Sequence, residues 1–268
     1  MSCFGFIGVG NMGSALARAL CKTVPAQEVL VTNRTAEKAV RLAAELGCRT
    51  AADNAAAARE ADMLFLGVKP QMMKGVLAEL APVLKERTAP FTLISMAAGL
   101  SIGDIQRMAG GSYPVIRIMP NTPASIGAGM ILYCSSAEVT PAVQAVFLQA
   151  LSAAGRFCAL PESLMDAGSA LSGCGPAFVD LFVEALADGG VACGLPRAQA
   201  QELAAQTVLG SAALILESGS HPGVLKDQVC SPGGSTIQGV RTLEAQGFRS
   251  ACLEAVCAAY EKTRALGK

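Results

Sequence analysis

The sequence predicts an α/β domain with a parallel sheet, followed by an all-helical domain. Three observations indicate this. First, short apolar runs alternate with longer alanine-rich segments up to about residue 160. Second, these runs are apolar on both faces, which is typical of strands in a parallel sheet. Third, no convincing strand follows Glu162. A length of 268 residues suits one large domain or two modest ones. We therefore expect domains at residues 1–160 and 161–268.

Each expected element follows from a local pattern of apolar residues and breakers. The expected strands are residues 3–7, 28–32, 63–66, 91–95, 114–119 and 129–134. The expected helices of the first domain are residues 12–22, 36–46, 71–85 and 102–108, and Gly47 provides a stop after the second of them. The second domain is expected to contain three long helices at residues 162–190, 197–217 and 236–266, separated by breakers at 194–196 and 218–234.

Charge and composition exclude several classes of protein. Lys plus Arg and Asp plus Glu both total 21, and hydrophobic residues make up 52% of the chain. A net charge of zero gives no general attraction for nucleic acid or anionic lipid, and the apolar content excludes a disordered chain. Charged residues make up only 16%, so we expect a large apolar interface between subunits.

Ten cysteines and one histidine limit the possible chemistry. No Cys-x-x-Cys pair occurs, and a single histidine, His221, excludes a histidine-rich metal site and argues against a Ser-His-Asp triad. We therefore expect free thiols in a reducing cytosol and no metal.

No membrane segment is expected. The first apolar run follows the N-terminus without a basic region, so no signal peptide is expected and we predict a cytoplasmic protein. The most membrane-like window, residues 177–195, carries Asp180, Glu184 and Asp188 on one helix face. That spacing favours a helix with a polar face over a membrane span.

A glycine motif predicts a dinucleotide site. Residues 8–13 read Gly-x-Gly-x-x-Gly directly after the first expected strand and at the start of the first expected helix. Gly8 permits the tight turn, Gly10 leaves room for a pyrophosphate, and Gly13 lets the helix and strand pack closely. N–H groups at the helix start then face the phosphates. The alternative is a plain glycine-rich connection, which this context disfavours.

The loop after the second strand predicts the choice of cofactor. An NAD enzyme usually carries an acidic residue there, whereas this chain has Asn33, Arg34 and Thr35. Amide, guanidinium and hydroxyl groups can donate hydrogen bonds to a 2′-phosphate, so we predict NADP as the cofactor. NADH stays open as a second hydride donor. Arg34 could instead be a solvated surface arginine.

Two later loops also follow strands of the same sheet and are expected to line the ribose and the nicotinamide. They are residues 67–71 and 95–99, and Lys69 in the first of them could equally be a surface lysine. Residues 48–54, where a third strand and its loop would fall, are too rich in alanine to reveal adenine contacts.

Five segments together resemble the pyrroline-5-carboxylate reductases: residues 5–13, 68–71, 119–123, 171–177 and 231–236. They occur in the family's order along the whole chain, and the last is specific to that family. The resemblance implies a Rossmann-like N-terminal domain and an all-α C-terminal dimerisation domain. It also implies the last step of proline biosynthesis, in which NADPH reduces L-Δ1-pyrroline-5-carboxylate to L-proline. It further implies an obligate homodimer, often assembled into a larger ring.

The resemblance also implies roles for individual residues. The backbone N–H groups of Gly233, Gly234, Ser235 and Thr236 would hold the substrate carboxylate, and the Thr236 hydroxyl would hydrogen-bond the ring nitrogen. In the family, the substrate lies between one subunit's nicotinamide and this loop of its partner. The alternative is a simple helix start capped by Ser235 or Thr236, which does not explain the paired glycines.

The same resemblance implies places or roles for further residues. The turn at residues 120–123 would lie near the nicotinamide, and residues 172–176 would kink the first long helix of the second domain. Asn54 would lie near the adenosine end of the cofactor, although it could also be a helix-start residue. His221 is expected to lie in a turn and to have no catalytic role. Cys174 is likewise expected to have no catalytic role. The predicted cofactor-binding residues are Ile7, Gly8, Val9, Gly10, Asn11, Met12, Gly13, Asn33, Arg34, Thr35, Asn54, Val68, Lys69, Pro70, Ala97, Ala98 and Gly99.

The expected mechanism needs little from the protein beyond orientation. The cofactor supplies hydride to C5 of the cyclic imine, Thr236 orients the imine, and the proton comes from solvent or is already present. One alternative is a β-hydroxyacid-dehydrogenase-like enzyme, but residues 162–190 lack the lysine that such enzymes use. The other alternative, a non-catalytic NADP-sensing protein, would not need a loop for the substrate carboxylate.

Overall fold

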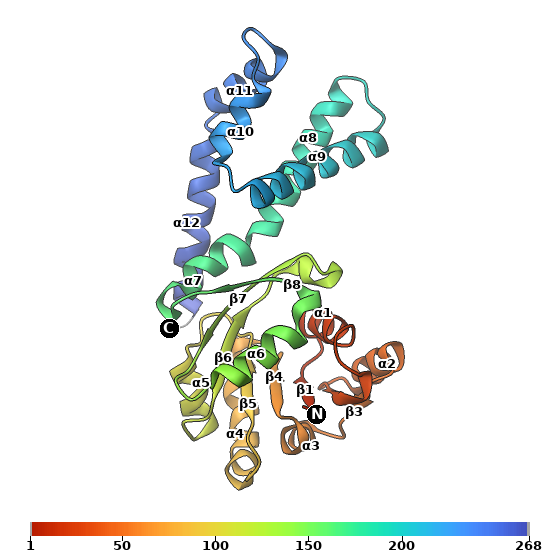
Figure 1. The fold of residues 1–268 in the computed structure, drawn as a ribbon, viewed down its shortest axis with the longest axis vertical. Helices are drawn as coiled ribbons and strands as arrows, with labels where there is room; N and C mark the ends of the chain where they lie inside the picture. Colours follow the sequence, from red (N-terminus) through yellow and green to blue (C-terminus); the bar gives the residue numbers. More distant parts are fainter. Residues whose placement is uncertain (1, 267–268) are drawn as a thin grey trace. The chain divides into compact units, whose positions relative to one another are not determined.

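The computed structural model describes residues 2–266 as two compact units (Figure 1). Unit 1 runs to Cys174 and resumes at Ala259, and unit 2 is Gly175–Ala258. This division falls later in the chain than the change of pattern near residue 160. Residues 1, 267 and 268, at the outer ends of the two predicted domains, lie outside the described residues.

Unit 1 contains one sheet in the order β3-β2-β1-β4-β5-β6-β7-β8. The strands are β1 (Phe4–Ile7), β2 (Val29–Thr32), β3 (Arg49–Thr50), β4 (Met63–Leu66), β5 (Thr92–Ser95), β6 (Val115–Met119), β7 (Gly129–Ser135) and β8 (Gly155–Ala159). The helices are α1 (Asn11–Leu20), α2 (Ala36–Leu46), α3 (Asn54–Glu60), α4 (Pro70–Glu86), α5 (Ile102–Ala109), α6 (Pro141–Ala150) and α7 (Met165–Gly168). Short 3-10 turns lie at Ala26–Glu28, Thr122–Ile126, Ser152–Ala154 and Glu162–Leu164, and a π-helical turn lies at Ser169–Gly173.

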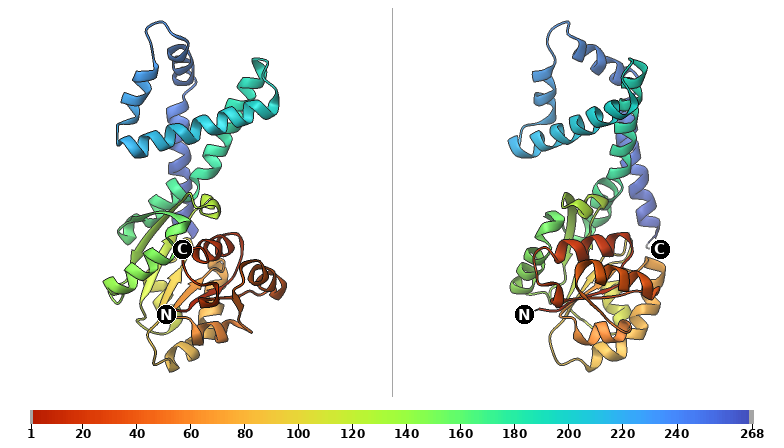
Figure 2. Two further views of the ribbon diagram at one scale, coloured as in Figure 1. Left: turned by 45° about the vertical axis from the view of Figure 1, so that its right-hand side comes forward. Right: turned by 90° about the vertical axis from the view of Figure 1, so that its right-hand side faces the viewer.

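Helices cover both faces of this sheet, as the apolar strands predict (Figure 2). Alternate strand residues enter two separate cores, because side chains alternate across a strand. Phe6 and Phe65 stack with ring centroids 4.3 Å apart in the core under α1, α2 and α6. Leu64 and Leu66 enter the other core, under α3, α4 and α5. Each fully buried Leu or Phe contributes about 1.5–3 kcal/mol.

The sheet is mostly parallel, as expected, but it contains one antiparallel strand pair that the sequence did not predict. β6 and β7 run antiparallel, with Ile116 opposite Ser135. The connection from Met119 to Gly129 holds only a 3-10 turn, which is too short for a crossover to a parallel neighbour. The other pairings are parallel. Strand β8 and helices α3 and α6 were not expected from the sequence.

Unit 2 contains helices only, as expected. They are α8 (Gly175–Ala192), α9 (Arg197–Ser218), α10 (Pro222–Val229), α11 (Ser235–Ala245) and the first part of α12 (Phe248–Leu266), which ends in unit 1. The core of unit 2 is small: Ala187, Ala200 and Ala204 are its buried residues, with Val183 and Val191 packed against them.

The three long helices expected in the second domain are all present, but two are interrupted. The stretch expected at 162–190 begins with a 3-10 turn, α7 and the π-helical turn before α8. The stretch expected at 236–266 ends at Ala245 and resumes at Phe248, because Gly247 adopts φ +76°. The expected breaker at 218–234 contains α10, and His221 caps that helix by accepting the Gly223 N–H at Nδ1 over 3.0 Å. His221 therefore does not lie in a simple turn.

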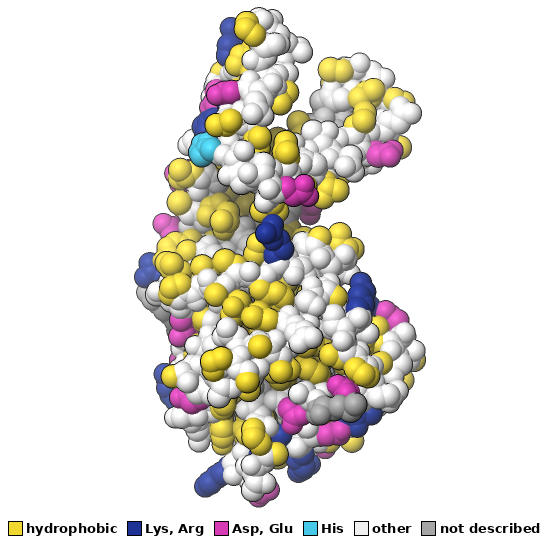
Figure 3. Space-filling view, in the orientation of Figure 1, with side chains coloured by type: hydrophobic (Ala, Val, Ile, Leu, Met, Phe, Trp, Pro, Cys, Tyr) yellow, Lys and Arg dark blue, Asp and Glu magenta, His cyan; other side chains and the backbone are white. Residues whose placement is uncertain are grey.

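One helical stretch among the described residues, Glu162–Ala192, is long and apolar enough to cross a membrane by length and composition. Only 11% of its most apolar window is buried. Asp180, Glu184 and Asp188 lie along α8, and all three are exposed. Apolar side chains also lie on the visible face of the unit 2 helices (Figure 3).

Candidate functional site

The predicted cofactor loops lie at one edge of the sheet. Ile7 pairs with both Thr32 and Leu66, and Leu66 pairs with Ser95, so β1, β2, β4 and β5 end in one row. The loops that follow these strands therefore emerge side by side. Ligands of open α/β sheets bind at this carboxyl edge. The structure thus brings together the predicted residues of the loops that begin at Gly8, Asn33, Gly67 and Met96.

The three glycines of the motif have distinct geometries. Gly8 adopts φ +95°, and a Cβ there would lie 2.6 Å from the Gly67 carbonyl oxygen. A Cβ on Gly13 would lie 2.3 Å from the Gly8 oxygen, whereas a Cβ on Gly10 would have no atom within 4 Å. Gly8 and Gly13 are therefore required by backbone packing. Gly10 instead leaves open space beside the loop, as an approaching pyrophosphate requires.

The start of α1 presents donors to that space. Gly10 is the N-cap residue and offers no side-chain cap, and the first backbone bond of the helix runs from Ser14 N–H to the Gly10 oxygen over 2.9 Å. The N–H groups of Asn11, Met12 and Gly13 have no hydrogen-bond partner within residues 2–266. Unpaired N–H groups at a helix start favour an anion. The residues present therefore fit a dinucleotide pyrophosphate.

Asn33 has a structural role that the sequence does not reveal. Its Oδ1 accepts the Val9 N–H at 3.1 Å, and its Nδ2 donates to the Thr35 oxygen at 3.1 Å. The side chain thus ties the glycine loop to the loop after β2. Because the amide is used in this way, Asn33 shapes the site rather than presenting a free donor to it.

Arg34 and Asn54 lie on neighbouring loops at the same end of the sheet. The Arg34 guanidinium approaches the Met72 sulfur on α4 at 3.9 Å. Asn54 is the first residue of α3, which is capped by Asp53, and its Nδ2 donates to Glu79 at 3.3 Å. A cavity of about 320 Å³ lies between the glycine loop and α2 and is lined by Gly10 and Asn11, among others.

The loops after β4 and β5 are positioned by their helices and turns. Lys69 is the N-cap residue of α4 and Pro70 its first residue, where the missing N–H of proline costs nothing. Val68 packs against the core under α3 to α5. Ala97 is buried, and Gly99 turns the chain with φ +74°. These loops follow directly from the strand ends at the carboxyl edge of the sheet.

The predicted substrate loop lies in unit 2 and forms a tight turn before α11. Gly233 adopts φ +69°, and the Gly234 N–H donates to the Ser231 oxygen at 3.0 Å. That N–H is therefore used within the turn. The N–H groups of Ser235 and Thr236 have no partner within residues 2–266, and Gly234, the N-cap residue, provides no side-chain cap. Neither Ser235 nor Thr236 is the cap.

The Thr236 hydroxyl is free and exposed. Other helical threonines, such as Thr207 and Thr242, donate their hydroxyls to carbonyls four residues earlier, at 2.7 and 3.0 Å. Thr236 lies in the first turn of α11 and makes no such bond. A polar ligand at the loop can therefore use this hydroxyl without breaking an existing bond.

Asn121 joins three segments of unit 1 beyond β6, a role that sequence reasoning missed. Its Nδ2 donates to the Ser172 oxygen in the π-helical turn at 2.9 Å, and its Oδ1 accepts the Met130 N–H on β7 at 2.9 Å. The side chain thus fixes the turn at residues 120–123 to the chain that leads toward α8. Asparagine between two prolines was the only sequence signal.

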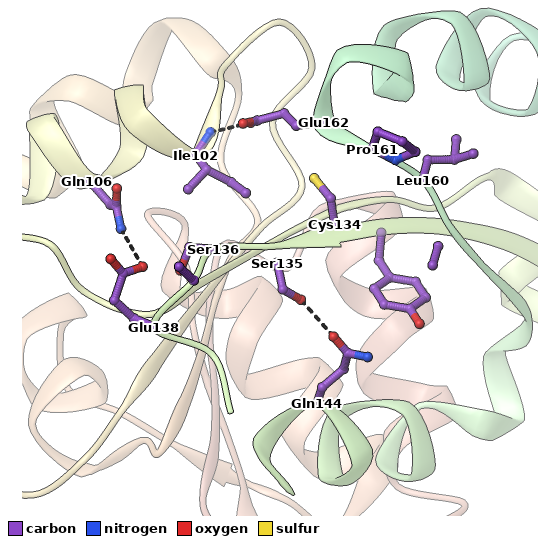
Figure 4. Close-up of a pocket in the computed structure, with 13 residues that line it drawn as sticks. Ile102, Gln106, Cys134, Ser135, Ser136, Glu138, Gln144, Leu160, Pro161 and Glu162 are labelled. Carbon is purple, nitrogen blue, oxygen red and sulfur yellow. Dashed lines mark hydrogen bonds between the residues drawn. The ribbon is translucent and has the colours of Figure 1, made fainter. Parts of the chain in front are cut away.

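A separate cavity of about 520 Å³ contains none of the predicted residues (Figure 4). Ser135 lies at its wall and opposite Ile116 at the start of β6, away from the carboxyl edge. Its polar groups bind one another: Gln106 donates to Glu138 at 3.2 Å, and Ser135 donates to Gln144 at 3.2 Å. We assign it no ligand.

The Cys134 thiol, in the wall of the same cavity, is held in its protonated form by its surroundings. Burial, and secondly the nearby Glu162, raise the pKa of its thiol to about 11. Within residues 2–266, no group of three His, Cys, Asp or Glu side chains could hold a metal ion.

Two family models match the chain. Residues 162–266 match the model described as pyrroline-5-carboxylate reductase dimerisation, and residues 3–99 match the model described as NADP oxidoreductase, coenzyme F420-dependent. The first covers the segment that contains the substrate loop, and the second covers the glycine loop and the loops after β2 and β4.

Curated relatives match over nearly the whole chain. Pyrroline-5-carboxylate reductase from Synechocystis sp. is 46% identical over 266 residues, with 98% of both chains covered. The Escherichia coli enzyme of the same name is 41% identical, again with 98% of both chains covered.

Solved structures of pyrroline-5-carboxylate reductases also match the fold of this chain. A pyrroline-5-carboxylate reductase from Coxiella burnetii superposes with a TM-score of 0.91 at 33% identity, covering 100% of this chain and 99% of that one. The Plasmodium falciparum enzyme, solved with NADP bound, gives a TM-score of 0.86 at 33% identity and covers 100% of this chain and 98% of that one.

Proposed function

This chain belongs to the pyrroline-5-carboxylate reductases, and we propose that it reduces L-Δ1-pyrroline-5-carboxylate to L-proline with NADPH. The full-length similarity to curated enzymes of that name supports this reaction, and both the NADP family model and the NADP-bound relative agree with the cofactor predicted from the sequence. When bound, NADPH supplies the hydride that C5 of the cyclic imine accepts.

Residues 8–13 hold the pyrophosphate in this proposal. The free N–H groups of Asn11, Met12 and Gly13 donate to its oxygens, and Gly10 leaves the approach open. The loop after β2, including Arg34 and Thr35, lies beside the adenosine ribose, and Asn54 lies toward its outer end. Val68, Lys69 and Pro70, together with Ala97, Ala98 and Gly99, line the nicotinamide side of the edge.

The substrate carboxylate binds at residues 233–236. The N–H groups of Ser235 and Thr236, which lack partners and lie at the start of α11, carry this assignment. Gly233 gives the turn its positive φ, and Gly234 closes the turn onto Ser231. Gly234 therefore shapes the loop, and the N–H groups of Gly233, Ser235 and Thr236 are the donors that remain for the carboxylate.

The Thr236 hydroxyl orients the imine. It is exposed and unpaired, so it can hydrogen-bond the ring nitrogen of a substrate whose carboxylate is held by the adjacent N–H groups. This fixes the face of the C=N bond that meets the hydride. The proton on nitrogen comes from solvent or is present on the imine before binding. A protonated imine accepts hydride more readily than a neutral one.

Substitution of Thr236 tests this role. We expect Thr236→Ala to lower kcat/KM for pyrroline-5-carboxylate by about tenfold to a hundredfold, the loss for one hydrogen bond that orients the reacting group. Thr236→Ser keeps the hydroxyl and is expected to retain most of the activity. The readout is the imine-dependent loss of NADPH absorbance, with the affinity for NADPH measured separately and expected to be unchanged.

Thr242→Ala is the matched control on the same helix. Its hydroxyl already bonds the Gln238 carbonyl, so its removal leaves the substrate loop intact. Full activity of Thr236→Ala, or a large loss of NADPH binding in that variant, would contradict the proposed role.

We also propose how the subunits assemble. The exposed apolar faces of unit 2 and the match to the dimerisation model support a homodimer, in which the loop at residues 231–236 serves the cofactor of the partner subunit. The dimers assemble further into rings, as the family resemblance implies. Residues 1–160 then act as the NADP-binding domain and residues 161–268 as the dimerisation and substrate-binding domain.

We propose a cytoplasmic location without membrane contact. All ten cysteines are free, which suits a reducing compartment. The carboxylates of Asp180, Glu184 and Asp188 along α8 favour a covering protein surface over lipid.

A further inference from the structure

The cavity of about 320 Å³ beside the glycine loop is lined by more basic groups than the sequence motif predicts. One wall is the backbone around Gly10 and Asn11, and the other is formed by side chains of α1 and α2. Arg18, Lys38 and Arg41 all reach it, together with a single carboxylate, Glu45. Arg34, the cation that the sequence assigned to the cofactor, does not line it.

The cations differ in how far they are compensated. Arg18 binds Glu45 through two hydrogen bonds, at 2.7 and 2.8 Å, and so neutralises the one acidic group of the cavity. Lys38 and Arg41 form no ion pair with any described residue. Arg41 is also attracted to Glu45, so three cations share the one carboxylate of the cavity.

The position of these two cations on α2 is only partly compensated by the helix itself. The helix begins at Ala36, so Lys38 lies in its first turn, where the helix dipole disfavours a positive charge. Arg41 follows three residues later on the same face, and like charges at this spacing repel each other. Glu37 in the same first turn and Glu45, four residues after Arg41, offset these penalties in part, and a bound anion would offset the rest.

The other basic and amide groups of the loop after β2 are directed elsewhere. Both polar atoms of Asn33 are used within the loop, toward Val9 and Thr35. The Arg34 guanidinium contacts Met72 on α4, on the far side of the loop from α1. The Asn33 amide is thus not free to bind a charged group in the cavity, and Arg34 does not line the cavity.

The position of the cavity fits one group of the cofactor. In this fold the pyrophosphate binds at the start of the first helix and the adenosine ribose extends toward the end of the second strand. The 2′-substituent of that ribose therefore lies between the glycine loop and α2. A phosphate there carries a charge of about −2 near neutral pH, which two unpaired cations would match.

We propose that Lys38 and Arg41, rather than Arg34, bind the 2′-phosphate of NADPH and set the preference for NADPH over NADH. The proposal rests on the proposed function for the identity of the cofactor. It assigns Arg34 to the adenosine face shared by both dinucleotides.

Binding to the full-length protein tests the proposal without catalysis. Calorimetric titration gives the Kd for NADP, NAD and adenosine 2′,5′-bisphosphate. Lys38→Ala and Arg41→Ala are each expected to weaken NADP binding about fivefold to tenfold, and the double variant about fiftyfold. The Kd for NAD is expected to stay within about twofold, because NAD lacks the 2′-phosphate.

Glu45→Gln provides a test in the opposite direction. Removing the carboxylate releases Arg18 and takes a negative charge away from the cavity, so NADP is expected to bind about threefold more tightly. A damaged fold cannot produce a gain of this kind. Lys85→Ala, which removes an exposed cation in the last turn of α4, is the matched control and is expected to leave every Kd unchanged.

Two results would overturn the proposal. One is a double variant that weakens NAD and NADP equally, and the other is an Arg34→Ala variant that alone removes the discrimination. A third result would count against the proposed reaction alone. In it, the wild-type protein prefers NADP and the double variant does not, but the wild-type protein fails to reduce the imine. The phosphate site would then stand without that reaction.

Discussion

Gly10 and Gly13 belong to one hexapeptide, yet the structure gives them opposite tolerance for a side chain. A Cβ at Gly10 meets open space, and its φ of −68° suits any residue. A Cβ at Gly13 would lie 2.3 Å from the Gly8 oxygen. The first glycine thus leaves open space beside the loop, and the second is required by the packing of the backbone.

Alanine substitutions separate these two roles. Gly10→Ala is expected to leave the free energy of unfolding within about 0.5 kcal/mol of wild type while weakening NADPH binding more than about tenfold, because the new methyl group occupies the pyrophosphate approach. Gly13→Ala is expected to cost about 1–3 kcal/mol through backbone displacement. Urea unfolding and NADPH fluorescence titration measure the two effects.

Gly75→Ala is the control, since it adds a methyl group to the middle of α4 with nothing within 4 Å. It is expected to be neutral or to stabilise by up to about 1 kcal/mol. Unimpaired NADPH binding in Gly10→Ala would contradict the assignment of that residue.

At this scale the sequence predicts backbone roles better than side-chain roles. The glycines could be located because their requirement follows from the order strand, loop, helix. The use of Asn33 by Val9 and Thr35 could not, because it depends on how two loops meet across the sheet edge. Lys38 and Arg41 were passed over for the same reason. Exposed cations on a helix are common, and only the folded structure shows which of them line a cavity beside the glycine loop.

Helix α5 shows how an element is fixed at its start. Asp104 N–H donates to the Ser101 hydroxyl at 3.1 Å, and Ser101 N–H donates back to the Asp104 carboxylate at 3.0 Å. This reciprocal pair anchors a helix whose Ile102 and Ile105 are buried beside α4. The Ser101 hydroxyl, and then the backbone and Arg107, lower the pKa of Asp104 below its ordinary value of 3.8.

Asp104→Ala is therefore expected to lower the free energy of unfolding by about 1 kcal/mol at pH 7. Because the folded-state pKa is below the unfolded one, the stabilisation is fully present above the unfolded pKa of 3.8 and is lost as the pH falls through the folded value. The difference between wild type and variant should shrink below about pH 4.

Urea unfolding midpoints between pH 7 and pH 3 measure this. Asp104→Asn keeps an acceptor oxygen and removes the titration, so its smaller deficit should also close at low pH as wild type loses its own contribution. If the loss of unfolding free energy in Asp104→Ala stayed constant from pH 7 to pH 3, this would contradict a lowered pKa of Asp104 in the folded protein.

Local patterns predicted the elements that are closed by clear breakers. β4 is an apolar run between Asp62 and Gly67, and α2 ends at Gly47 with φ +68°, so both bounds were predicted correctly. β8 is half-buried at the sheet edge and has no regular alternation of apolar residues, so it gave no signal. α10 was missed although Pro222 follows a capping residue, because the surrounding Ser, Gly and Pro favoured a loop. The antiparallel direction of β7 depends on a long-range pairing that no local pattern contains.

Unit 2 cannot account for its own apolar residues. Its buried core is three alanines, whereas Leu181 and Leu209 are 67% and 62% exposed. Soluble monomers rarely leave large contiguous apolar faces in water. A second subunit that covers these faces explains both the small core and the apolar composition of the chain.

Leu209→Glu tests which surface covers α9. A glutamate placed in an apolar contact between subunits leaves a buried, unpaired charge, so we expect the dimer to dissociate at micromolar concentration. Val40→Glu introduces the same charge at an exposed apolar residue of α2, 58% exposed, and is expected to leave assembly unchanged.

Light scattering after size-exclusion chromatography without detergent gives the mass of each variant. A wild-type protein that needs detergent to stay in solution would favour lipid as the cover. A Leu209→Glu variant with the mass of wild type would place the subunit contact elsewhere.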